Sequence, residues 1–140
     1  MQTFLPYANF KKTATVLDDK RLFKQLIEAR QLIALITHGK TKSGKKYIGW
    51  RNHPARHMWN GHAQALKEYT NAILREIQHR GKVKTSAHFF RPKNIVYPLW
   101  LGNKKFHAAH RAALLAKNPE YYSRFGWQEK PEIKYIWPKN

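Results

Sequence analysis

Residues 15–37 read TVLDDKRLFKQLIEARQLIALIT, and this stretch decides the fold that the sequence predicts. Its apolar residues recur three and four positions apart, which is the spacing of one helix face. The predicted buried stripe consists of Leu22, Leu26, Ala29, Ile33 and Ile36. Thr15 with Asp18 three residues on resembles a capping box, so we expect a helix from about Thr15 to Thr37, ended by Gly39.

A second helix is predicted from about Pro54 to Arg80, because proline suits a first helical turn and Gly81 can end the helix. Its apolar face would hold Met58, His62, Leu66, Tyr69, Ile73 and Ile77. A third helix fits Asn103 to Lys117, with Asn103 as N-cap and a break at Asn118-Pro119. No long stretch alternates at period two, as a sheet would require. We expect an all-α fold in which residues 1–140 form one domain of about three main helices, with irregular aromatic-rich connections and an irregular C-terminal tail.

Charge indicates the partner. Lysine and arginine number 27 against 8 acidic residues, which gives a formal net charge of +19. Self-repulsion on this scale destabilises a compact chain, so a polyanionic partner is the natural compensation, and we expect double-stranded DNA. The 14% aromatic content supplies a core and argues against a disordered basic tail. A merely soluble basic protein and a membrane-surface protein are the alternatives, and the second lacks an unpartnered amphipathic segment.

Other classes of site and location are disfavoured. Cysteine is absent, so there is no disulfide and no thiolate ligand. His53 and His57 are four residues apart, but no acidic residue completes a metal motif, and we expect no metal and no cofactor. The first residues do not resemble a signal peptide, and no apolar run reaches the roughly 20 residues of a membrane span. We expect a monomer in the cytoplasm, associated with the nucleoid when bound to DNA.

Glu28 is the acidic residue whose setting invites a catalytic role. At helical spacing its neighbours are cations and amides: Arg21, Lys24, Gln25 and Gln31. Cations can hold phosphate while the carboxylate acts on the sugar, as cleavage of a nucleotide requires. An ordinary ion pair between Lys24 and Glu28 explains the same spacing equally well.

Two further segments are candidates for DNA contact. The motif WRNHPA, residues 50–55, leads into the second helix, where Arg51, Asn52 and His53 would form a phosphate or sugar cradle. A plain capping segment is the alternative. Nearer the C-terminus, Arg111, Lys117 and Arg124 are interleaved with aromatic residues, as in a strip that binds phosphates and stacks on bases.

Taken in order, three segments resemble the pyrimidine-dimer DNA glycosylases, small helical base-excision enzymes typified by a bacteriophage endonuclease. They are KRLFKQLIEARQ (20–31), NHPARHMWNGHAQALKEYTNAILREIQHRG (52–81) and HRAALLAKNPEYYSRFG (110–126). The resemblance puts Glu28 on the family's essential glutamate and Arg111 on a phosphate-binding arginine.

The resemblance implies a glycosylase and AP lyase in which the free α-amine of the chain attacks the damaged nucleotide. Such an amine has a pKa of roughly 7.7–8.0 against about 10.4 for lysine, so more of it is neutral at pH 7. The sequence departs from the pattern in two ways. Gln2 is bulky enough to keep Met1 in place, so that Met1 would supply the amine, and Gln2 stands where the family has an arginine. A glycosylase that uses water activated by Glu28, and a non-enzymatic DNA-binding protein, stay open as alternatives.

Overall fold

The structure is a computed structural model that describes residues 1–38 and 52–139. The helices are α1 Phe10–Val16, α2 Asp19–His38, α3 Pro54–Trp59, α4 Ala63–Arg80, α5 Lys104–Lys117 and α6 Pro119–Tyr122, followed by the 3-10 turn η2 Ser123–Phe125. No strand forms within these ranges, and the all-α prediction is confirmed. Gly39 and Arg51 lie outside the described residues. Among the described helices, none has the length and apolar character needed to cross a membrane.

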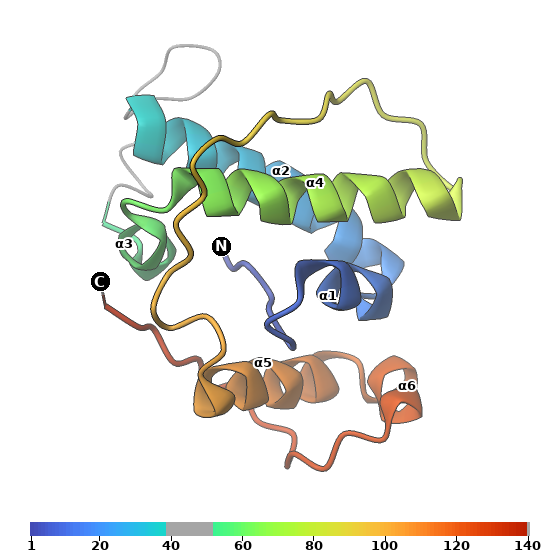
Figure 1. The fold of residues 1–140 in the computed structure, drawn as a ribbon. Helices are drawn as coiled ribbons and strands as arrows, with labels where there is room; N and C mark the ends of the chain where they lie inside the picture. Colours follow the sequence, from blue (N-terminus) through green and yellow to red (C-terminus); the bar gives the residue numbers. More distant parts are fainter. Residues whose placement is uncertain (39–51, 140) are drawn as a thin grey trace.

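One shared core holds the helices together. Helices α2 and α4 pack against each other on one side of the N-terminal segment, and α5 lies on the other side (Figure 1). Most of the two predicted apolar faces is buried as expected, whereas Ile36 and His62 are only half-buried. The N-terminal segment, residues 2–5, is buried between these layers and adds Phe4 and Leu5 to the core.

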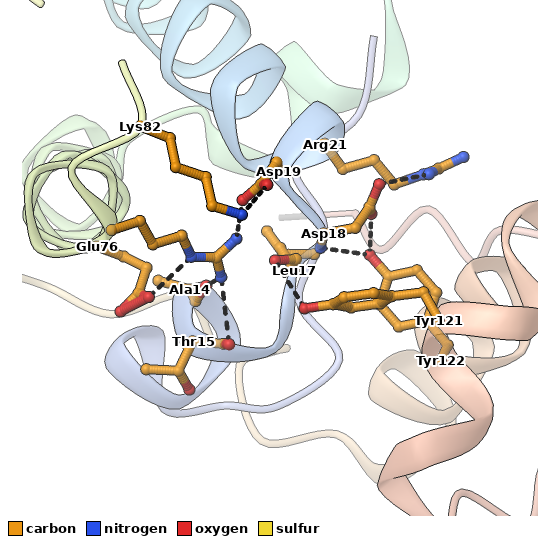
Figure 2. A network of polar contacts seen from close by, with 11 residues as sticks. Ala14, Thr15, Leu17, Asp18, Asp19, Arg21, Glu76, Lys82, Tyr121 and Tyr122 are labelled. Atoms are coloured by element: carbon orange, nitrogen blue, oxygen red, sulfur yellow. Dashed lines mark hydrogen bonds and ion pairs between the residues drawn. The ribbon is translucent and has the colours of Figure 1, made fainter. Parts of the chain in front are cut away.

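The predicted start of the first helix is wrong. Thr15 belongs to the separate helix α1, which ends at Leu17 in extended backbone, and α2 begins only at Asp19. The cause is a distant partner: the Asp18 amide donates to the Tyr122 hydroxyl at 3.0 Å, and that hydroxyl donates back to the Asp18 carboxylate (Figure 2). Arg21 also donates to this carboxylate, at 3.1 Å. Asp18 therefore anchors a corner between helices rather than a capping box.

Cations tie the same corner to the far end of α4. Arg80 donates to Glu76 and Asp19, both at 2.9 Å, and to the Ala14 carbonyl at 3.2 Å. Lys82 adds a 2.7 Å bond to Asp19, and these two cations hold the pKa of the Asp19 carboxyl below its usual value. These contacts hold α1, α2 and α4 together as one unit.

The second predicted helix is broken in two, whereas its predicted end is confirmed. Helix α3 stops at Trp59 and α4 starts at Ala63, with Gly61 between them at a φ of 81° that favours glycine. The break lets the Trp59 side chain enter the core fully. Gly81 ends α4 in the left-handed conformation, as its position predicted.

The third predicted helix is confirmed, and a short helix follows it before the irregular tail. Asn103 caps α5 by accepting from the Phe106 amide at 3.0 Å. Asn118 ends α5 and also caps the short helix α6, because its side-chain oxygen accepts from the Tyr121 amide. The tail is irregular from residue 126 on, as expected, and the short helix before it forms because one asparagine both stops one helix and starts the next.

Candidate active site at the N-terminal segment

The N-terminal segment is held by side chains rather than by a sheet. Buried backbone groups need hydrogen-bond partners, and α2 and α4 supply them. Gln25 accepts from the Phe4 amide and donates to the Gln2 carbonyl, each at 2.8 Å. The Tyr69 hydroxyl lies 2.8 Å from the Phe4 carbonyl and 2.7 Å from the Gln25 amide oxygen. Both the oxygen and the nitrogen of the buried Gln25 side-chain amide therefore serve to fix this segment.

Helices α3 and α5 complete the clamp. The Trp59 indole donates to the Thr3 hydroxyl at 2.9 Å. His110 Nδ1 accepts from the Leu5 amide at 2.8 Å, and His107 Nδ1 lies 2.7 Å from the Leu5 carbonyl. Because His107 Nε2 accepts from the Gly102 amide, its Nδ1 carries the proton and donates. The path of the chain leading back to Met1 is thus set by four helices.

This path brings the start of the chain to Glu28. The Glu28 side chain is buried, and its Oε2 accepts from the Gln2 amide at 3.1 Å. Its Oε1 lies 3.7 Å from Lys24 Nζ, whose side chain is 67% exposed, so this ion pair adds little stability. Glu28 therefore makes the predicted intrahelical pair and also contacts the residue next to the α-amine. Burial of the carboxylate against the N-terminal segment could not be inferred from the helix spacing.

Histidine and aromatic side chains complete the surroundings. His53 caps α3 by accepting from the Ala55 amide at 3.0 Å, and its ring meets the edge of Trp137 with centroids 5.5 Å apart. Burial lowers the pKa of His53; the charge of the Met1 amine lowers it further, and Glu28 opposes this. Burial raises the pKa of Tyr135. The charge of Arg21 lowers this pKa by a smaller amount, and the charge of Glu28 raises it. Several helices and the C-terminal tail thus meet around one amine and one carboxylate.

Tyr135 and Trp137 were not among the predicted site residues. Tyr135 packs against Phe4 and His110, with ring centroids 6.2 and 6.0 Å apart. The sequence signal was the aromatic character of the C-terminal stretch, but nothing in that stretch shows which aromatics return to the N-terminal segment.

The remaining predicted site residues are spread over several settings. Arg111 donates to Glu129 at 3.0 and 3.2 Å and to the Pro6 carbonyl at 2.7 Å. Lys117 and Arg124 are exposed, and Arg124 lies over the Tyr121 ring at 4.2 Å. The other predicted contacts on the described chain are the half-buried Gln31 on α2 and the exposed Asn52 before α3. Arg111 thus connects α5, the residue that follows the N-terminal segment, and the tail, and phosphate binding by these residues stays a prediction.

Within the residues that the structure describes, no group of three or more histidines and acids is arranged to hold a metal ion. His107 and His110 contact the N-terminal segment, and His53 caps a helix. These three histidines therefore have structural partners of their own.

The buried His110 should make stability depend on pH. Burial, with a smaller effect of His107, lowers the pKa of His110 to about 3. An unfolded chain binds this proton below about pH 6.5 and the folded protein does not, so the free energy of unfolding should fall as pH drops from about 6.5 toward about 3. The loss from this residue should reach about 1.4 kcal/mol per pH unit inside that window. Urea unfolding followed by tryptophan fluorescence at several pH values measures it.

Two histidine substitutions separate this effect from general acid sensitivity. His110→Asn should be less stable than the parent at neutral pH, with a shallower loss on acidification. His88→Asn, at an exposed position, should leave the pH dependence unchanged. An unchanged slope in His110→Asn would show that other groups control acid unfolding.

One comparison with known proteins gives a family match. A family model described as pyrimidine dimer DNA glycosylase matches residues 1–90. The matched range contains the N-terminal segment and helices α1 to α4, and with them Met1, Glu28 and His53. No curated protein and no solved structure gives a significant match.

Proposed function

The chain belongs to the pyrimidine dimer DNA glycosylase family, and on this premise we propose that it excises a damaged or modified pyrimidine from duplex DNA through the α-amine of Met1 and Glu28. Glycosylase activity on DNA is the activity of the family. The nucleophile, the lyase step and the residue roles are our proposal. We propose further that residues 1–140 act as one monomeric domain, in the cytoplasm with the nucleoid.

The contact between Glu28 and the Gln2 amide carries the proposal. It holds the carboxylate one residue from the α-amine, although 26 residues separate Gln2 and Glu28 in sequence. In the proposed reaction the neutral amine attacks C1′ of the damaged nucleotide, and the base leaves with the electrons of its glycosidic bond. Glu28 stabilises the positive charge that develops on the sugar.

The same two groups suffice for strand cleavage. Loss of the amine proton and opening of the sugar ring give an imine between Met1 and C1′. Removal of a C2′ proton then breaks the bond from C3′ to its phosphate oxygen. In this proposal Glu28 assists these proton transfers. Water activated by Glu28 would excise the base without an imine, and the strand would then stay intact.

Substrate binding is proposed for the predicted basic and polar residues. They are Gln2, Arg21, Lys24, Gln25, Gln31, Arg51, Asn52, His53, Arg111, Lys117 and Arg124. Gln2 has a specific reason to take part: its side-chain oxygen accepts from the Thr3 amide, but its buried Nε2 has no hydrogen-bond partner among the residues that the structure describes. A buried donor without a partner is unfavourable. An acceptor on the substrate would satisfy it after a small movement of the surrounding chain.

Binding to undamaged duplex should depend strongly on salt. If the basic surface neutralises about six phosphates, log K should fall with log salt at a slope of about −5, because condensed counterions are released. The net charge of +19 motivates this expectation. Fluorescence anisotropy of a labelled duplex over a salt series measures the slope, and a slope close to zero would contradict binding through phosphates.

Incubation with lesion-bearing duplexes tests the function itself. Ultraviolet-irradiated duplex and duplexes with single modified pyrimidines are treated with the protein, and released base and nicked strand are quantified separately. Base release with nicking supports the full proposal, and base release alone supports the water mechanism. Salt-dependent binding with no base release from any substrate would instead indicate an architectural or regulatory DNA-binding protein.

A further inference from the structure

Leu99 is an apolar side chain in an unusual position. It is as exposed as in an extended chain, at 101% of the reference value, although Pro98 before it and Trp100 after it are buried. A single exposed leucine on a mobile loop would not indicate a functional site. The turn of residues 98–102, which carries Leu99, is instead held firmly from both sides.

Hydrogen bonds and ring packing fix this turn. The Leu101 amide donates to the Pro98 carbonyl at 3.1 Å, and the Trp100 indole donates to the Met58 carbonyl at 2.9 Å. The Trp100 ring packs edge-on against Trp59, with centroids 5.0 Å apart. Leu99 therefore projects from a rigid support, whose position at the start of α5 can be followed in Figure 1.

Two bridges join the turn to the N-terminal segment. On one side, Trp100 packs on Trp59, whose indole donates to Thr3 at 2.9 Å. On the other side, the Gly102 amide donates to His107, which in turn bonds the Leu5 carbonyl. The turn is thus held to residues 2–5, the segment whose Gln2 amide contacts Glu28.

The charge around the turn suits DNA. No acidic residue occurs from residue 77 to residue 119, and the exposed Lys104 and Lys105 follow the turn directly. Glu68 lies close to the turn, because it accepts a hydrogen bond of 2.6 Å from the hydroxyl of Tyr97, the residue before Pro98. Val96 and Tyr97 before the turn are exposed as well, at 63% and 48%, but Leu99 is the most exposed of the three. An apolar tip beside two lysines fits a base step flanked by phosphates.

We propose that Leu99 is a wedge that enters the base stack next to the nucleotide held at Met1 and Glu28, while Lys104 and Lys105 bind the flanking phosphates. An enzyme that acts on a base in duplex DNA must take that nucleotide out of the stack, and an inserted apolar side chain fills the gap that remains. The inference rests on the proposed function, because the engaged nucleotide is the one whose base is excised.

The test separates unstacking from chemistry. The duplex probe carries a tetrahydrofuran abasic analogue, which the amine cannot attack, beside a fluorescent 2-aminopurine. Binding of the unmodified protein should raise the 2-aminopurine fluorescence, since a wedge separates this base from its neighbour. Leu99→Ala should largely remove the rise and should slow base excision from a lesion duplex about tenfold or more, since it loses the burial of a leucine side chain.

Matched variants control for simple loss of contact. Val83→Ala removes another exposed apolar side chain of the segment between α4 and α5 and should behave like the parent. Lys104→Ala with Lys105→Ala should lower the salt slope by about two without abolishing the fluorescence rise. Because the Leu99 side chain is fully exposed, an unchanged melting temperature is expected for Leu99→Ala.

Each outcome decides one point. A fluorescence rise in Leu99→Ala equal to that of the parent, or no rise in either protein, would overturn the wedge even if excision is normal. An equal loss in Val83→Ala would overturn it as well. If no lesion is excised by the parent but the fluorescence rise depends on Leu99, the proposed function fails and the wedge stands as a feature of DNA binding.

Discussion

Glu28→Gln should retain DNA binding and lose base excision by about 10²–10⁴-fold, which is the usual contribution of one positioned acid or base. The substitution keeps the size of the side chain, and its amide oxygen can still accept from the Gln2 amide, so the N-terminal segment should stay in place. The negative charge that would stabilise the sugar cation is removed, and so is the group that would move protons. Single-turnover excision from a lesion duplex measures the loss.

A charge-matched control guards against a general electrostatic effect. Glu120→Gln makes the same change at an exposed position of α6 and should leave excision unchanged. Binding by Glu28→Gln should equal or slightly exceed that of the parent, because one negative charge facing phosphate is gone. Near-normal excision by Glu28→Gln would reduce Glu28 to its ion pair with Lys24 and its contact with Gln2.

Borohydride added during turnover should trap a covalent protein–DNA complex, and mass spectrometry should place the link on Met1. The imine proposed above is the species that borohydride reduces. Acetylation of the α-amine, or an uncleaved extension before Met1, should abolish the cross-link completely, because an amide nitrogen is not nucleophilic. The fold should survive, since the clamp from Gln25, Tyr69 and Trp59 acts on Gln2 and the residues after it.

Lys24 is the rival nucleophile, because its amine lies 3.7 Å from the Glu28 carboxylate. Lys24→Arg keeps the charge, cannot form the imine, and should cross-link normally if Met1 is the nucleophile. A cross-link that persists after the α-amine is blocked and disappears in Lys24→Arg would transfer the role to Lys24. Excision without any cross-link would indicate a glycosylase that uses water.

Features controlled by neighbours a few residues apart could be predicted from the sequence. The buried stripe of α2, the left-handed end of α4 at Gly81 and the cap of α5 by Asn103 each follow from residues within one or two helical turns. The helical class belongs to the same group. Composition added the expectation of a nucleic-acid partner, since net charge does not depend on the fold.

Tertiary contacts decided the rest. The helix that looked continuous from Thr15 is interrupted because Tyr122, 104 residues away, binds Asp18. The Gln2 amide meets Glu28 across 26 residues, and the Leu5 amide meets His110 across 105. Residues 2–5 form no helix or strand in the described part of the chain, so the path of the N-terminal segment depends mainly on side chains from other elements. Helix spacing placed Glu28 on a polar face. Only the folding of the remote helices onto residues 2–5 brings the start of the chain to that carboxylate, because no local periodicity shows which distant side chains will hydrogen-bond a buried backbone.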